Sequence, residues 1–208
     1  MKKSLKFLLV LLAVLLTVAI SLSVTIKFTT KTGQLGDDVY FAVNTITNTA
    51  VIYGNGEMWH YSYDLSVYPP GTDTDSLRGP SPLTLDHKDT IQKLIIMDGV
   101  TNISFMALAE CAALETIYVP ETVREIWFGA FWGCHNLSEI HFEGDTPEPV
   151  LPDYAEDTAA NTFCSDYFFQ KDFPTIYYSG GTAGWDTEIW NGFTTIAEEY
   201  KIDWSPMK

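Results

Sequence analysis

Residues 91–145 read IQKLIIMDGVTNISFMALAECAALETIYVPETVREIWFGAFWGCHNLSEIHFEGD. Apolar or small residues recur in this stretch every 23 positions. The matched sets are Ile91, Leu114 and Leu137; Leu94, Ile117 and Ile140; Ile96, Val119 and Phe142; Val100 and Val123; Ile103 and Ile126; Ala107 and Ala130; Leu108 and Phe131; and Cys111 and Cys134. A fixed period between about 20 and 50 residues is typical of a repeat architecture. The stretch therefore predicts a solenoid.

One repeat unit is readable in physical terms. Residues 100–103 predict a short extended segment, residues 107–111 have helix-like apolar spacing, and residues 114–119 predict a strand with alternate residues pointing inward. A single unit cannot bury its apolar edge, so stacked units must place like residues above like. Each buried Leu, Ile or Phe contributes about 1.5–3 kcal/mol, more than a surface ion pair at about 0–1 kcal/mol.

These residues resemble the BspA-type leucine-rich repeats of bacterial surface proteins. The motif has a V-x-x-I segment at 123–126, an A-F-x-x-C turn at 130–134 and an L-x-x-I-x-V-P strand at 114–120. Residues 51–58 and 176–206 are similar to the flanks of such repeats, so the likeness extends over about residues 39–208. The resemblance implies a right-handed solenoid outside a cell, with adhesion or partner binding as its role.

The predicted fold is mainly β with short helical turns, arranged as a right-handed leucine-rich-repeat solenoid of about three turns. We divide the chain into residues 1–26 (signal peptide or signal anchor), 27–38 (irregular spacer), 39–89 (N-terminal hairpin cap and loop), 90–145 (repeats) and 146–208 (degenerate repeat and C-terminal cap). The last part contains an insertion loop at 147–160, an imperfect unit at 163–178 and a short closing helix around 187–199. Ile176 and Tyr178 are expected to continue the apolar ladders.

The N-terminus has the features of a targeting segment. Lys2, Lys3 and Lys6 precede the uncharged run Phe7–Ile26, whose 20 residues would rise about 30 Å in a helix. Both a cleaved signal peptide and a retained membrane anchor fit this pattern. In either case the positive-inside rule predicts an exported body.

The rest of the chain is strongly acidic. Beyond residue 26 there are 9 basic and 27 acidic residues, a net charge of −18. Such a body repels phosphate backbones, so we expect no nucleic-acid partner. The acidic charge favours cationic partners.

The residues that most suggest chemistry have simpler interpretations. Cys111 and Cys134 share one repeat position and are predicted to be buried thiols, as is Cys164. The histidines lack the spacing of a zinc site, and Asp73 with Asp75 lacks the other ligands of a calcium loop. We therefore predict no catalytic residue, metal or cofactor.

The outward residues of the repeat strands are the expected binding face. If the ladder residues point inward, their neighbours form an outward column with a flanking row. The predicted face consists of Ile95, Tyr118, His141 and Tyr177, with Lys93, Thr116 and Glu139 beside them. The column is either a contact strip or a set of strand-forming residues that another segment covers. A second aromatic group, Trp127, Phe128 and Trp132, either packs against the insertion or binds a ligand.

Three functions remain open at this point. The first is a non-catalytic surface protein whose solenoid face binds a protein or glycan outside the cell, with possible membrane attachment through residues 7–26. The second is a structural or accessory envelope protein without a soluble ligand. The third is a hydrolase that uses acidic residues, which requires clustered carboxylates in a concave pocket.

Overall fold

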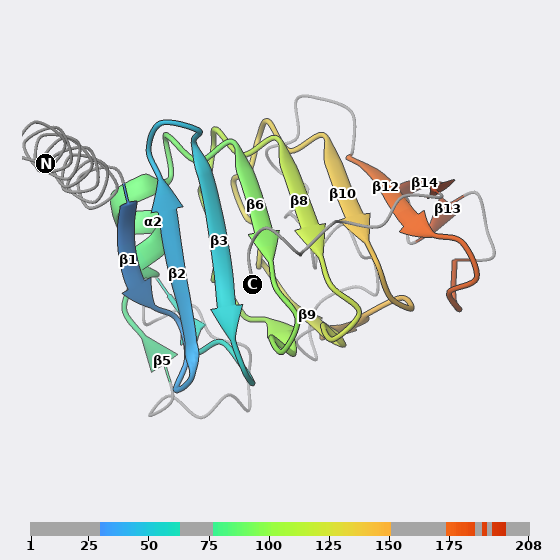
Figure 1. The fold of residues 1–208 in the computed structure, drawn as a ribbon, viewed down its shortest axis with the longest axis horizontal. Coiled ribbons are helices and arrows are strands. Elements are labelled where there is room, and N and C mark those ends of the chain that lie inside the picture. Colours follow the sequence, from blue (N-terminus) through green and yellow to red (C-terminus); the bar gives the residue numbers. More distant parts are fainter. Residues whose placement is uncertain (1–29, 63–76, 151–173, 186–188, 191–192, 199–208) are drawn as a thin grey trace, which may run out of the picture.

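The computed structural model describes residues 30–62, 77–150, 174–185, 189–190 and 193–198. Most of these residues lie in or beside a nine-stranded sheet (Figure 1). Its strands, in spatial order, are β1 (Thr30–Gln34), β2 (Val39–Asn44), β3 (Thr49–Gly54), β6 (Lys93–Ile96), β8 (Thr116–Val119), β10 (Glu139–Phe142), β12 (Thr175–Ser179), β14 (Phe193–Glu198) and β13 (Ile189–Trp190). The predicted mainly β class is confirmed.

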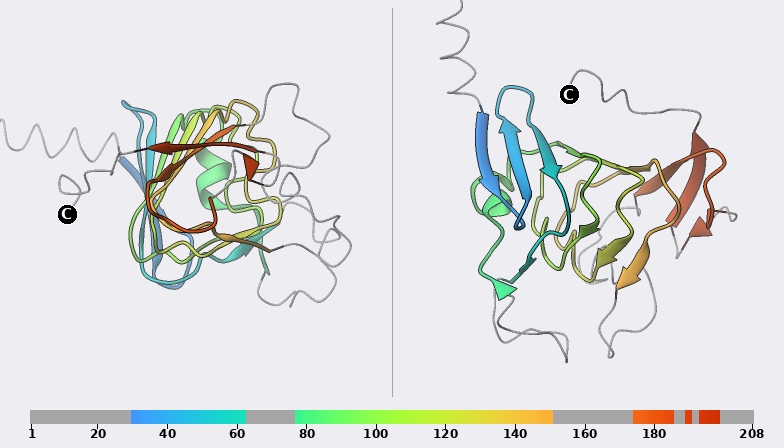
Figure 2. Two further views of the ribbon diagram at one scale, coloured as in Figure 1. Left: turned by 90° about the vertical axis from the view of Figure 1, so that its right-hand side faces the viewer. Right: turned by 60° about the horizontal axis from the view of Figure 1, so that its bottom comes forward.

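Two smaller sheets accompany the large one. Three parallel strands form the order β11 (Glu148–Val150), β9 (Glu125–Trp127) and β7 (Asn102–Ile103). The third sheet pairs β4 (His60–Tyr61) with β5 (Leu77–Arg78). Viewed along the stack, the repeat units overlie one another and enclose a common interior (Figure 2).

The repeat strands of both sheets pair in a register that equals the sequence period. Thr116 pairs with Lys93 and with Glu139, each 23 positions away. In the smaller sheet Glu125 pairs in the same way with Asn102 and Glu148. Each unit is therefore paired with its neighbour through two separate strands. These two pairings fix the position of the unit along the stack and its rotation about the axis of the stack.

The apolar ladders lie between the sheets. The exposed fraction is 1% for Leu94 and 0% for Ile117, Ile140 and Ile176. The last of these pairs with Ile140, and Tyr178 pairs with Phe142, so the predicted continuation of the ladders is confirmed. Cys111 and Cys134 are buried cysteines in the same core, as predicted.

The helical turn predicted at residues 107–111 is wrong. The backbone makes successive tight turns there, with the N–H of Ala107 donating to the carbonyl of Ser104. Met106 and Glu110 have positive φ angles of 55° and 62°, which break a right-handed helix. The equivalent positions one repeat later are Gly129 and Gly133, with φ of 65° and 76°. Glycine adopts this conformation without a steric penalty, so the second repeat carries the residues that the turns favour.

The N-terminal hairpin predicted within residues 39–89 is confirmed as β2 and β3. The irregular spacer predicted for residues 27–38 is wrong over 30–34, because β1 pairs antiparallel with β2 there. As an edge strand with polar residues, β1 lacks the apolar alternation that identifies a half-buried strand. Gly33 accommodates the Phe41 ring, since a Cβ at position 33 would lie 2.4 Å from its Cε1 atom.

Two segments predicted as loops contain regular structure. The loop predicted to follow the hairpin within residues 39–89 contains β5 and α2 (Pro82–His87), whose Leu83 is fully buried. The predicted insertion loop at 147–160 begins with β11, which pairs with β9. Proline at the first helical position of α2 is compatible with a helix start, and tertiary pairing overrides the loop composition around Pro149.

The short helix predicted around residues 187–199 is wrong. Residues 189–190 and 193–198 form the strands β13 and β14, and β14 pairs in parallel with β12. The β-branched residues Thr194, Thr195 and Ile196 suit a strand, and pairing satisfies the backbone groups that β12 would otherwise leave exposed.

Several predictions concern residues outside the described ranges. These are the targeting segment 7–26, Asp73 and Asp75, residues 151–173 with Cys164, and the end of the C-terminal cap after residue 198. Within the described ranges, no helix is long and apolar enough to cross a membrane.

The ladder packing predicts a large effect for Ile117→Ala. Ile117 is fully buried between equivalent residues of β6 and β10. Its truncation should lower the free energy of unfolding by about 2–5 kcal/mol, because a packed core leaves a cavity. Ile46→Ala is the control, since Ile46 is 70% exposed and its loss should cost no more than about 0.5 kcal/mol. Urea denaturation measures both values, and similar losses would contradict the ladder.

The burial of the repeat cysteines predicts that their thiols are protected. In a Cys164→Ser background, Cys111 and Cys134 should react with a disulfide reagent only after the protein unfolds, because both are no more than 1% exposed. Thiol titration with and without denaturant measures this protection. Rapid modification of either thiol under native conditions would show that the core is open at this ladder.

Candidate functional site

The predicted outward column forms one continuous row of paired residues. Ile95 pairs with Tyr118, Tyr118 with His141, and His141 with Tyr177. We call these four residues the outer row. The same register places Lys93, Thr116 and Glu139 side by side as the flanking row. All seven residues predicted for the face therefore lie together on the large sheet.

The column was expected to be either an open strip or covered, and at Ile95, which is only 5% exposed, it is not open to solvent. The N-terminal hairpin extends the sheet beyond β6, so Ile95 lies between Val51 on β3 and Tyr118 on β8. Tyr118, His141 and Tyr177 are partly buried. Solvent therefore reaches the outer row at β8, β10 and β12.

The three rings of the outer row are stacked. The centroid distances are 4.6 Å between Tyr118 and His141 and 4.7 Å between His141 and Tyr177, with interplanar angles of 13° and 12°. The ammonium of Lys93 lies 4.4 Å from the centroid of the Tyr118 ring, in cation–π contact. The faces of His141 are thus occupied by the row itself, and a ligand meets mainly the edges of the stack.

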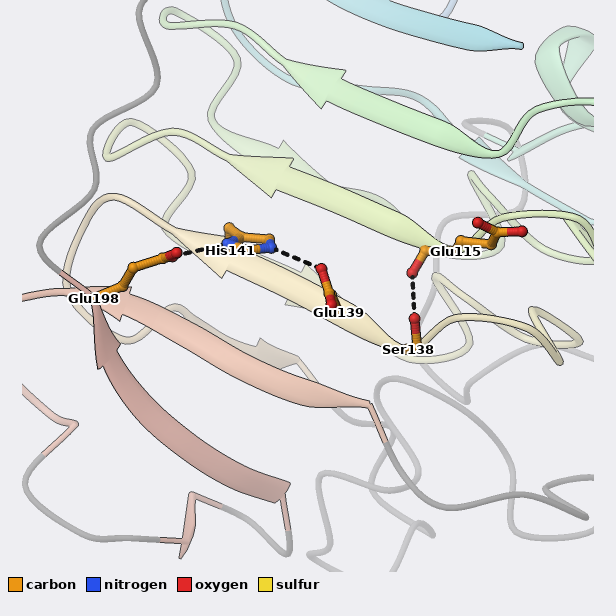
Figure 3. A network of polar contacts seen from close by, with 5 residues as sticks. All are labelled: Glu115, Ser138, Glu139, His141 and Glu198. Atoms are coloured by element: carbon orange, nitrogen blue, oxygen red, sulfur yellow. Dashed lines mark hydrogen bonds and ion pairs between the residues drawn. The ribbon is translucent and has the colours of Figure 1, made fainter. Parts of the chain in front are cut away.

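His141 lies between two carboxylates (Figure 3). Its Nδ1 is 3.0 Å from Glu198 Oε2, and its Nε2 is 3.4 Å from Glu139 Oε2. Glu139 comes from the same strand, whereas Glu198 reaches over from β14, with β12 between them. The side chain of His141 is 12% exposed, compared with 45% for Glu139 and 35% for Glu198. The contact joins β10 to β14 and leaves both carboxylates accessible.

The sequence did not reveal the importance of Glu198. The repeat period ends before β14, and residues 187–199 were expected to be helical, so nothing placed this residue beside His141. The signal that could have found it is the β-branched run at 194–196, which suits a strand that continues the sheet.

The second aromatic group is used for packing where its contacts are described. The ring of Trp127 lies 4.3 Å from that of His60, and Phe128 stacks on Phe105 at 6.1 Å. Trp132 lines a cavity of about 300 Å³ together with the ion pair between Lys88 and Glu110, whose charged atoms are 3.1 Å apart. Trp127 and Phe128 therefore pack against rings that lie outside the expected insertion, rather than against the insertion itself.

A larger cavity of about 560 Å³ was not foreseen from the sequence. Asp37, Asp38 and Glu57 line it, and the β2–β3 pairing brings these three together. The indole N–H of Trp59 donates to Asp37 and the amide of Asn55 to Asp38. Both aspartates therefore already take part in hydrogen bonds.

His60 lies at the inner side of this cavity. Burial lowers the pKa of its imidazole, and the nearby Glu57 carboxylate opposes that shift. Its Nδ1 contacts the hydroxyl of Ser104 at 2.5 Å, but Ser104 is 0% exposed. A nucleophile must reach its substrate, so we regard this pair as a structural contact. Among the described residues no group of three or more His, Cys, Asp or Glu side chains is placed to hold a metal ion.

Comparison with known proteins bears on the repeats. Residues 85–149 match the family model described as a BspA type leucine rich repeat region (6 copies). No curated protein matches the chain. A crystal structure of a leucine-rich repeat protein from Eubacterium ventriosum ATCC 27560 is similar, with a TM-score of 0.41 and 14% sequence identity. The alignment covers 81% of this chain but only 40% of the Eubacterium ventriosum protein, so this chain spans less than half of the length of that protein. The repeats of this chain, residues 85–149, are therefore similar to BspA-type leucine-rich repeats.

Proposed function

We propose that this chain is an exported, non-catalytic surface protein that binds a partner through the outer face of its large sheet. The main support is the in-register outer row, in which His141 stacks between two tyrosines and contacts two accessible carboxylates. The apolar run Phe7–Ile26 behind three lysines supports export, by cleavage or by anchoring. The resemblance to bacterial surface repeats supports the same location.

The proposed architecture extends the observed stacking. The units form a right-handed solenoid, with the β2–β3 hairpin and α2 covering one end and β13 with β14 closing the other. Terminal units of a solenoid must cover the last apolar edge, and the burial of Leu83 and Phe193 supports this assignment. The outer row lies between these two ends, on β6, β8, β10 and β12.

The geometry of the outer row favours a protein partner over a glycan. Sugars commonly bind by stacking on an aromatic face, but in this row the faces of His141 are taken by Tyr118 and Tyr177. The accessible groups are ring edges and the carboxylates of Glu139 and Glu198. Such groups suit directional polar contacts with protein side chains.

A non-catalytic role fits the surroundings of the acidic cavity. Asp37 and Asp38 accept hydrogen bonds from neighbouring side chains. The buried Ser104 next to His60 cannot reach a substrate. The pair of Ser104 and His60 is therefore not an accessible nucleophile and base, although the carboxylates of Asp37, Asp38 and Glu57 share this cavity, as a hydrolase that uses acidic residues would require.

Site-specific photo-crosslinking tests the proposed face. A benzophenone amino acid at Thr116 or Tyr177 of the full-length chain, displayed on cells, should form adducts with one defined extracellular protein. The matched position is Glu148, which is exposed on β11 of the smaller sheet and should give no such adduct. The proposal predicts that Tyr177→Ala abolishes the adduct at position 116, while removal of one stacked ring costs about 0.5–1.5 kcal/mol of stability. Equal adducts from both sheets, or none from the outer face, would contradict it.

A further inference from the structure

The residues that point outward from the large sheet form one mostly apolar strip. Beyond the outer row, Val51 pairs with Ile95 at one end, and Ile196 pairs with Tyr177 at the other. Ile196 is a large hydrophobic residue that is 45% exposed. The strip runs across neighbouring strands from β3 to β14. A contiguous apolar strip of this kind marks a surface on which another segment packs.

Burial along the strip is greatest at its centre. Ile95 is 5% exposed, and the side chain of His141 is 12% exposed. Tyr53 follows Val51 by two positions on β3 and so points to the same side, yet it remains 39% exposed although it packs against Tyr40. The hairpin strand β3 encloses Ile95 within the sheet, and the comparison with Tyr53 indicates further cover above the centre of the strip.

The described chain reaches this strip at its last strand. Glu198, at the end of β14, extends over β12 to contact His141 on β10 at 3.0 Å (Figure 3). Residues 199–208 follow Glu198 directly. Residues 1–29, in contrast, join the sheet at β1, on its opposite edge. The segment 199–208 therefore starts beside the outer row.

The sequence of this segment, EYKIDWSPMK, alternates apolar and polar residues at its centre. Tyr200, Ile202 and Trp204 are separated by Lys201 and Asp203. In an extended segment, the three apolar side chains lie on one side. Six extended residues span about 20 Å, and the four strand spacings from β14 to β6 amount to about 19 Å. The segment is thus long enough to bring its tryptophan to the far end of the outer row.

We propose that residues 199–208 dock on the outer row as an extended segment, with Tyr200, Ile202 and Trp204 turned toward the sheet. The covalent connection to Glu198 makes this contact intramolecular, so a modest affinity is sufficient for docking. The contact itself needs no external partner. Its consequence for regulation rests on the proposed function: an external protein that binds the same face must displace the segment, which lowers the apparent affinity of that protein.

Photo-crosslinking within the purified full-length chain tests the docking. A benzophenone amino acid at Thr116 or Met97, two residues from the outer row on either side of it, should form an adduct with residues 200–208, which a glutamate-specific protease releases. The matched position is Glu148, which is exposed on β11 of the smaller sheet and should give no such adduct. An equal mixture with isotope-labelled chain separates adducts within one chain from adducts between chains by mass. Adducts only between chains, equal yields from Glu148, or no adduct from either position on the large sheet would overturn the proposal.

Two sets of substitutions test which side of the segment docks. Tyr200→Ser combined with Ile202→Ser and Trp204→Ser should lower the adduct yield from Thr116 by about tenfold or more, because the apolar side chains that pack on the row are removed. The matched control, Lys201→Ser with Asp203→Ser, alters the opposite side without changing the net charge, and its yield should stay within about twofold of the wild type. Equal losses in the two variants, or an unchanged yield in the first, would contradict docking through the apolar side.

The same triple variant separates this inference from the proposed function. On cells, it should increase the adduct between position 116 and the external protein at least about threefold, because the row is vacated. An unchanged external adduct after loss of the internal one would reject displacement. An internal adduct in the wild type, without any external adduct from either chain, would reject the proposed function and leave the docking of residues 199–208 intact.

Discussion

Parallel pairing between strands 23 residues apart is the constraint on which the rest of this structure depends. It operates twice in each unit, at β6–β8–β10 and at β7–β9–β11, so that every unit is fixed to its neighbour at two separate places. The backbone hydrogen bonds set the spacing, and the apolar ladders between the sheets supply most of the stabilisation. A side chain cannot change its position along the stack, or the side of the sheet on which it lies, unless the register of the whole unit shifts.

The outer row is a consequence of this constraint. Because inward residues are aligned, the residues between them are aligned as well, and Tyr118, His141 and Tyr177 stack although they lie far apart in sequence. The row is also where one charged group arrives from outside the repeat, since Glu198 on β14 contacts His141. The scaffold thus supplies regular spacing, and a non-repeated strand supplies the carboxylate that gives the face its proposed specificity.

The sequence was informative wherever the periodic pattern applied. The repeat predicted that Ile117 lies in the core and that Cys111 and Cys134 are buried thiols at the same repeat position. It also predicted the alignment of the outer row as far as Tyr177. It failed where pairing rather than pattern decides structure: β1 is a polar edge strand, β11 contains a proline, and β14 was taken for a helix. The acidic cavity and the Glu198 contact also escaped prediction, because both depend on segments that meet only after the sheet has formed. The burial of Ile95 follows from the added hairpin, which the repeat alone does not specify.

Deletion of one repeat tests the role of the register most directly. Removing the 23 residues 116–138 puts Glu139 directly after Glu115, at the position that Thr116 otherwise occupies, whereas removing only the 22 residues 116–137 shifts the register by one. Urea unfolding followed by far-ultraviolet circular dichroism measures the outcome. The account predicts a cooperative transition for the first deletion and its loss for the second, because a one-residue slip turns the ladder side chains toward solvent. Indistinguishable unfolding of the two deletions would contradict it.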